Sequence, residues 1–205
     1  FLPDTSDRIL NQLNIENGGL ESLTSFGVLP AGGKVVCPIT VQPTGAIGDV
    51  IVNEGGYIMA YDQSAEGKIT LDGGNLIIMD EAKVICDQSD GVLEAKRGAT
   101  ILNRGLLMVG NTLSLNHNSC LINETTGTLL IGGRIARERG GIGGFTAAEV
   151  TSRVKNEDYT YLCANKSKII NRGLISEPGD TQRTVSADAQ ANTIHEGGYI
   201  AIRKT

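Results

Sequence analysis

Two aspartates are the residues of this 205-residue chain best placed to do chemistry. Asp72 and Asp87 each follow a short β-rich phrase, so they could lie on neighbouring coils of a repetitive structure. Two carboxylates that flank a glycosidic bond are the arrangement that hydrolyses glycans. Asp is also a favoured turn residue because it hydrogen-bonds the local backbone, and that role explains both positions better. The sequence therefore predicts a chain that is not an enzyme, with no catalytic residue assigned.

The histidines and cysteines add no stronger chemistry. A nucleophile needs a base beside it, yet His117 lies in a turn-like Asn-His-Asn segment and His195 ends a β-rich phrase. No C-x-x-C pair is present, so we predict neither a metal site nor a cofactor. We expect Cys86 and Cys120 to be small buried residues, and a disulfide from Cys37 or Cys163 stays open.

One short phrase recurs along the chain: two β-forming residues, then a small polar residue, usually with glycine close behind. Such internal repetition is typical of a solenoid. Because aromatic residues make up only 4% of the chain while hydrophobic residues make up 40%, the core must be aliphatic. We predict an all-β parallel β-helix in which the polar residues stack as a structural ladder at one corner. These are Asn53, Asp72, Asp87, Asn103, Asn123, Asn171 and His195.

The residue that follows the polar position predicts a second ladder. Arg104, Glu124, Arg172 and Glu196 alternate in sign from one phrase to the next. If they line one face, they form ion pairs that fix the register of the coils, since a slipped coil would oppose like charges.

Segments outside the repeat divide the chain. Residues 1–33 are expected to form an N-terminal cap that contains a short helix at residues 4–13. Residues 34–205 are expected to form the β-helix, with an insertion at 134–167 and a smaller excursion at 177–191. The first residue, Phe1, and the repeat phrase just before Thr205 suggest a processed product or a fragment.

The insertion is the expected binding region, because solenoid insertions form loops on one face. Its Thr-Ala-Ala-Glu segment matches a capping box and predicts a helix over residues 146–155. The residues that could contact a partner are Arg137, Arg139, Phe145, Tyr159 and Tyr161.

Composition limits the classes of partner that the chain is expected to bind. The formal charge of −5 is unlike the basic footprint of a nucleic-acid binder. No segment approaches the roughly 18 apolar residues of a membrane span. We therefore expect no nucleic-acid partner and no direct membrane insertion.

The phrases around Asn103-Arg104-Gly105 and Asn171-Arg172-Gly173 resemble the repeats of filamentous haemagglutinin-like and autotransporter passenger β-helices. In those families an apolar-Asn-x-Gly-x-apolar unit recurs every coil. The resemblance covers residues 47–133 and 168–203, and the four cysteines, the uneven coil length and the large insertion depart from it. It implies a single-stranded right-handed parallel β-helix on a bacterial cell surface.

Three functions are consistent with these features. The leading expectation is a non-enzymatic extracellular segment for adhesion, or a rigid stalk, whose loops bind a host protein, a glycan or a neighbouring subunit. The second is a β-helix lyase or hydrolase that acts on polysaccharides. The third is a structural assembly piece such as a tail fibre, coat or scaffold.

Overall fold

The computed structural model describes the middle and C-terminal parts of the chain almost continuously, and the N-terminal part only as short strands. The described residues are 8–9, 21–23, 27–29, 34–36, 39–41, 49–54, 56–60, 68–86, 91–135 and 147–204.

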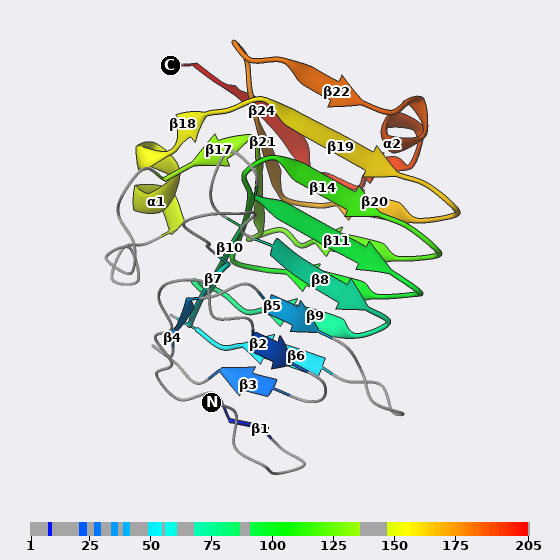
Figure 1. Ribbon diagram of the computed structural model, residues 1–205. Coiled ribbons are helices and arrows are strands. Elements are labelled where there is room, and N and C mark those ends of the chain that lie inside the picture. Colours follow the sequence, from blue (N-terminus) through cyan, green and yellow to red (C-terminus); the bar gives the residue numbers. More distant parts are fainter. Residues whose placement is uncertain are drawn as a thin grey trace.

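The described chain is an all-β parallel solenoid, as predicted, built from three sheets that we call A, B and C (Figure 1). Consecutive strands belong to sheets B, A and C in turn, so each coil contributes one strand to each sheet. Each strand pairs in parallel with the equivalent strands of the coils before and after it.

Sheet A contains eight strands, and sheets B and C contain seven each. Sheet A holds β1 (Arg8–Ile9), β3 (Gly27–Leu29), β6 (Asp49–Val52), β9 (Asn75–Ile78), β12 (Thr100–Asn103), β15 (Cys120–Asn123), β20 (Lys168–Asn171) and β23 (Thr193–His195). Sheet B holds β2 (Glu21–Leu23), β5 (Ile39–Val41), β8 (Lys68–Asp72), β11 (Val92–Lys96), β14 (Thr112–Leu115), β19 (Tyr159–Cys163) and β22 (Arg183–Val185). Sheet C holds β4 (Lys34–Val36), β7 (Tyr57–Ala60), β10 (Lys83–Cys86), β13 (Leu106–Val109), β16 (Thr128–Ile131), β21 (Leu174–Pro178) and β24 (Tyr199–Arg203).

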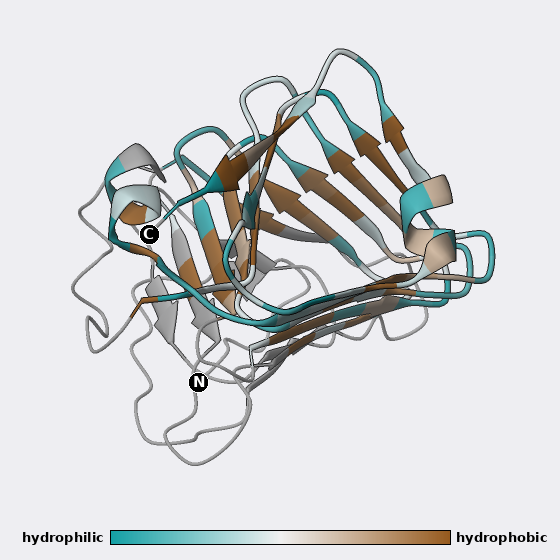
Figure 2. Ribbon diagram, turned by 90° about the horizontal axis from the view of Figure 1, so that it is seen from above, coloured by the Kyte–Doolittle hydropathy of each residue, from teal (hydrophilic) through white to brown (hydrophobic). Residues whose placement is uncertain are grey.

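The inward side chains of the three sheets form one core that is mostly aliphatic. Hydrophobic strand residues are brown in Figure 2. Side chains alternate between the two faces of a strand, so Ile101 and Asn103 of β12 point inward and Thr100 and Leu102 point outward. Inward residues of successive coils stack directly, as Ile101 does on Leu121. Fully burying one such side chain is worth about 1.5–3 kcal/mol, and no coil can do so without its neighbours.

The corner between sheets B and A is a stacked two-residue turn. Its central residues have positive φ in three successive coils: Arg97 and Gly98, His117 and Asn118, and Asn165 and Lys166. The residue after each pair donates its backbone N–H to the carbonyl of the residue before it, as from Ser119 to Asn116 at 3.3 Å. His117 is thus an exposed turn residue.

A second, smaller core lies outside sheet C. Helix α1 (Ala147–Arg153) packs Val150 against outward residues of sheet C, among them Ile85, Met108 and Leu130. An antiparallel pair, β17 (Gly133–Arg134) with β18 (Lys155–Asn156), ties the two ends of this segment together. Helix α2 (Ala187–Ala191) belongs to the interior core through Ala189.

The structure revises the segment boundaries expected from sequence. Residues 159–167 belong to a regular coil, since β19 pairs with β14 in sheet B, so the insertion of 134–167 was drawn too long. The 177–191 excursion likewise contains the end of β21, the sheet strand β22 and α2. The expected helix at 4–13 lies outside the described residues except for Arg8–Ile9, which form strand β1.

Candidate functional site

Four of the seven predicted polar residues form one hydrogen-bonded column, the asparagine ladder: Asn103, Asn123, Asn171 and His195. The side-chain Nδ2 of Asn103 donates to Oδ1 of Asn123 at 2.7 Å, and Nδ2 of Asn123 donates to Oδ1 of Asn171 at 2.8 Å. Nδ2 of Asn171 lies 3.1 Å from Nδ1 of His195. The three asparagines are completely buried, so these bonds satisfy amides that water cannot reach.

Each ladder amide also bonds across the corner to sheet C. The second N–H of Asn103, Asn123 and Asn171 donates to the backbone oxygen of Thr128, Leu174 and Tyr199, at 3.1, 3.0 and 3.4 Å. The ladder begins at Asn103 because the aliphatic Ile78 occupies the same column one coil earlier. Oδ1 of Asn103 consequently has no hydrogen-bond partner among the described residues.

A column of small residues runs beside the ladder and accounts for the glycine in the repeated phrase. Gly105, Gly127 and Gly173 each precede a sheet C strand, and each oxygen accepts from the coil above, as Gly127 does from Leu174 N–H at 3.0 Å. A Cβ added to Gly173 would collide with the carbonyl oxygens of Glu124 and Gly127. The close approach of the two sheets at this corner therefore requires glycine.

The predicted ion-pair residues line the outer side of the same corner, in a column that we call the charged column: Arg104, Glu124, Arg172 and Glu196. Nη1 of Arg172 lies 2.9 Å from Oε1 of Glu124, and Nη2 lies 3.0 Å from Oε2 of Glu196. Hydrogen bonding to Glu196, followed by the charge of Glu124, raises the pKa of Arg172. Arg104 stands next in the column, and among the described residues no ion pair joins it to Glu124.

Two other predicted ladder residues, Asn53 and Asp72, lie outside the ladder column. Asn53 directly follows β6 and sits one position past the ladder column, which Val52 occupies in that coil. Asp72 ends β8 in sheet B, not sheet A. Asp87 lies outside the described residues, directly after β10 of sheet C. A three-sided coil has three corners with similar turn chemistry, so the repeated phrase marked corners of different faces.

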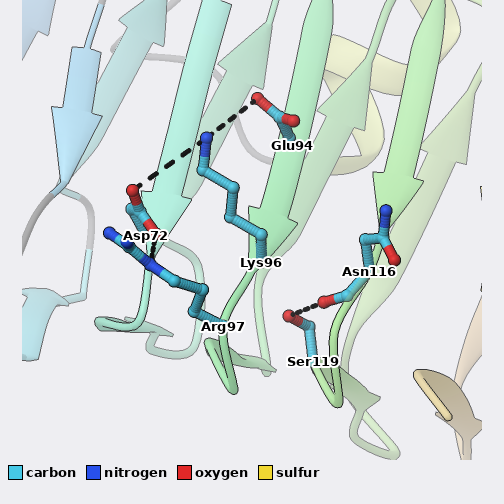
Figure 3. Close-up of polar contacts among 6 residues, drawn as sticks. All are labelled: Asp72, Glu94, Lys96, Arg97, Asn116 and Ser119. Carbon is cyan, nitrogen blue, oxygen red and sulfur yellow. Dashed lines mark hydrogen bonds and ion pairs between the residues drawn. The ribbon is translucent and has the colours of Figure 1, made fainter. Parts of the chain in front are cut away.

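The environment of Asp72 is that of a structural ion pair (Figure 3). Its side chain is 8% exposed, pairs with Arg97, and lies 3.9 Å from Nζ of Lys96. Lys96 also lies 3.9 Å from Glu94. The strand partner of Asp72 in β11 is the basic Lys96. Because Asp87 lies outside the described residues, the expected arrangement of the two aspartates on neighbouring coils stays a prediction.

The predicted binding-loop residues separate into two groups. Arg137, Arg139 and Phe145 lie outside the described residues. Tyr159 and Tyr161 belong to β19 and are 2% and 4% exposed, so they face the core and not a partner. The sequence placed both tyrosines in a loop because the ladder residues before and after them, Asn123 and Asn171, are 48 residues apart. This separation is much longer than one coil, so the repeat was not recognised there.

A polar cluster that sequence reasoning missed lies between the last two described coils. Glu177 occupies an inward position of sheet C in register with the aliphatic Ile202, yet it is only 3% exposed. Tyr159 donates its hydroxyl to Glu177 Oε2 at 3.0 Å, and Nη1 of Arg183 lies 3.5 Å from the same oxygen. Burial, and then the Glu177 charge, raise the pKa of Tyr159. The signal available in sequence was a Glu at a strand position whose alternation predicts an apolar residue.

This cluster borders a pocket of about 260 Å³. Its lining residues are Tyr161, Ile175, Glu177, Arg183, Gln190, Thr193, His195 and Ile200. Tyr161 and Thr193 share a short hydroxyl hydrogen bond inside it. Glu177 is its one carboxylate, so the pocket lacks the pair that glycan hydrolysis requires.

Arg203 holds the last strand to the coils below. Its guanidinium donates to the backbone oxygens of Ile131, Gly132 and Ser176 at 2.7–2.8 Å, and Nε donates to Oδ1 of Asn156 at 3.1 Å. Burial lowers the pKa of Arg203 to about 10. These bonds join β24 to β16, β21 and the β18 segment, a structural use of the arginine.

Two of the cysteines are free thiols. These are Cys120 and Cys163, and Cys37 lies outside the described residues. Cys86 is buried as expected, whereas Cys120 lies on the outer face of sheet A and is partly exposed. Burial raises the pKa of Cys163 to about 11.

Comparisons with known proteins returned no match to a family model, to a curated protein or to a solved structure. Within the described ranges, no group of three or more His, Cys, Asp or Glu side chains is placed to hold a metal ion. Neither described helix is long and apolar enough to cross a membrane. The class that the structure defines is thus a parallel β-solenoid, defined by its fold alone.

Proposed function

We propose that this chain is a rigid, non-enzymatic segment of a bacterial surface protein, which acts as a stalk and presents loops for adhesion to a host protein or a glycan. The observation that carries this proposal is the hydrogen bond from Asn123 to Asn171. Between these residues the chain leaves the solenoid, forms the α1 segment and returns in the same register. A rod that keeps its ladder across such an interruption can carry a variable loop without losing stiffness.

The anchoring of α1 supports a presenting role. Val150 and Val154 fix the helix to the outer face of sheet C, so the described residues on either side of 136–146 are held at defined points on the rod. Arg137, Arg139 and Phe145 remain the candidate contacts within that loop. The buried Tyr159 and Tyr161 do not.

The polysaccharide-cleaving alternative has less support. Asp72 is ion-paired, and the single carboxylate of the terminal pocket is held by Tyr159 and Arg183. A glycosidase needs a second carboxylate at a defined distance. The stalk and adhesion proposal requires no such group.

A binding screen with a loop-replacement variant tests the proposal. Residues 136–146 would be exchanged for a Gly-Ser linker of equal length, leaving α1 in place to cover sheet C. Wild type and variant would be screened against immobilised glycans and matrix proteins while released reducing ends are measured. We expect wild type to bind, the variant not to bind, and no reducing ends to appear.

The matched control is Thr184→Ala, at an exposed position of sheet B outside the replaced segment. It should bind as wild type does. Equal binding by the loop variant, or release of reducing ends, would overturn the proposal.

A further inference from the structure

An aliphatic stripe runs along the outer face of sheet A. In each of six successive strands of sheet A one outward position is Ile or Leu, and all six are in register. We call these residues the aliphatic stripe: Ile51, Ile77, Leu102, Ile122, Ile170 and Ile194. They are partly exposed, and Ile194 is 46% exposed. A shallow depression of about 240 Å³ lies over the stripe between Ile77 and Ile122.

The other two sheets do not present such a surface. On sheet C, α1 covers the outward apolar residues Ile85, Met108 and Leu130. The equivalent outward row of sheet B is mostly polar, with Thr70, Glu94 and Ser114 in register before Leu162. Neither described helix covers sheet A, because α1 packs on sheet C and α2 joins the interior core (Figure 2). A continuous apolar row left open on a folded domain marks an interaction surface.

The charged column borders the stripe and indicates the partner. Arg104 lies two positions after Leu102, so it has the same outward parity, and the same relation holds in the next three coils. The signs read plus, minus, plus, minus along the solenoid. When this column is reversed, its signs read minus, plus, minus, plus. Two copies that run in opposite directions therefore place opposite charges side by side.

We propose that the outer face of sheet A binds the same face of a second copy of this chain, with the two solenoid axes antiparallel. A two-fold axis parallel to the strands and between β15 and β20 places Arg104 opposite Glu196 of the partner subunit. It also places Glu124 opposite Arg172 of the partner subunit and stacks the two stripes. Such an isologous interface is the commonest way in which soluble proteins form dimers.

The opposite orientation lacks this complementarity. Facing the sheets with parallel solenoid axes reverses the strand direction and sets the charged column against the other rim of sheet A. That rim carries Asn75, Thr100, Cys120 and Lys168, which contain one charge among four residues. Only the antiparallel dimer gives each charge an opposite partner.

The size of the contact predicts a weak dimer. Four overlapping strands about 4.8 Å apart, each about 13 Å long, give a footprint on the order of 250 Å² per copy before the corners are added. This lies well below the roughly 800 Å² per partner of a standard stable interface. We therefore expect a dimer that forms reversibly and depends on concentration.

Sedimentation velocity of the full chain from about 5 to 500 µM, a range suited to a small interface, tests the proposal. Wild type should shift from monomer to dimer. Ile122→Asp should weaken the dimer at least about 10-fold, because it places a charge in the centre of the stripe. Leu162→Asp, an exposed residue of sheet B, is the matched control and should dimerise as wild type does. Monomeric wild type throughout, or equal weakening by both variants, would overturn the proposal.

A mixing experiment tests the antiparallel geometry itself. Arg104→Glu and Glu196→Arg should each weaken self-association, since each homodimer would oppose two pairs of like charges. In a mixture, a heterodimer of the two variants has every pair restored and should form more tightly than either homodimer. Circular dichroism would show that both variants are folded. A mixture that associates no better than its components would contradict the geometry.

Discussion

Asn123 donates its buried side-chain amide to Oδ1 of Asn171 at 2.8 Å, although 48 residues separate the two in the sequence. The same amide donates its other hydrogen to the Leu174 oxygen at 3.0 Å. One side chain thereby joins two coils and two sheets. This relationship explains why the chain can leave the solenoid for a whole helix and return without a change of register.

Removing the central amide of the ladder should destabilise the fold strongly. Asn123→Ala leaves the Asn103 amide and Asn171 Oδ1 buried without their partners, at a cost of about 2–4 kcal/mol in the free energy of unfolding. Urea unfolding followed by circular dichroism measures it. Asn53→Ala, one position off the ladder column, should change the same quantity by less than about 0.5 kcal/mol. Similar losses at the two positions would show that the ladder has no special role.

The glycine column predicts a contrast between two Gly→Ala variants. Gly173→Ala places a Cβ on two carbonyl oxygens, so it should cost about 3 kcal/mol or more. Gly98→Ala meets no atom within 4 Å but keeps a φ of +77°, so it should cost only about 1–2 kcal/mol. Thermal unfolding of both variants ranks them. A larger loss of stability for Gly98→Ala than for Gly173→Ala would contradict the close approach of the two sheets at Gly173.

Helix α1 should act as a cover for sheet C. Val150→Asp introduces a charge into the second core and should lower the free energy of unfolding by about 3 kcal/mol, or detach the helix. Binding of a hydrophobic dye to the native state would then rise, because Met108 and Leu130 become accessible. Ser152→Asp, exposed on the same helix, is the control and should not increase dye binding. Unchanged dye binding by Val150→Asp would contradict the covering role.

The buried Cys163 thiol should make stability depend on alkaline pH. The folded protein holds this proton more tightly than the unfolded chain, because burial raises the thiol pKa from 9.0 to about 11. The stabilisation is complete below pH 9, and the free energy of unfolding falls as the pH rises from about 9 to about 11. Urea titrations across this range measure the slope. Cys163→Ala should show a shallower slope, reduced rather than abolished, because burial also raises the pKa values of Tyr159 and Tyr161. An identical slope in the variant would rule out the thiol as a contributor.

The sequence was sufficient to predict the solenoid and the ladder positions Asn103, Asn123, Asn171 and His195, because a β-rich phrase with a polar residue and a nearby glycine recurs at that corner. The same pattern misplaced Asp72, which ends a strand of sheet B, whereas Asp87 lies outside the described residues. Asp suits the turn at any corner of a three-sided coil, and only the strand pairing shows which sheet it ends. The sheet that a residue joins is decided by pairing between strands that are distant in the sequence. The local sequence does not determine that pairing.

The insertion shows a second limit of sequence. The capping-box pattern predicted a helix at 146–155, and the helix spans Ala147–Arg153. The same reading placed Tyr159 and Tyr161 in a loop, because aromatic residues outside the apparent repeat suggest a binding surface. Their burial depends on β19 pairing with β14, which lies more than forty residues earlier. The inward carboxylate of Glu177 was missed for the same reason, since its partners Tyr159 and Arg183 are brought to it only by the coil.

A double-mutant cycle between Asn123 and Asn171 tests most directly the claim that the ladder carries the rod across its interruption. Unfolding free energies would be measured for wild type, Asn123→Ala, Asn171→Ala and the double variant. We predict a coupling of about 1–2 kcal/mol, with the double variant less destabilised than the sum of the single ones. Strict additivity would show that the two side chains do not interact in solution, and would contradict both the register across the insertion and the stalk proposed from it.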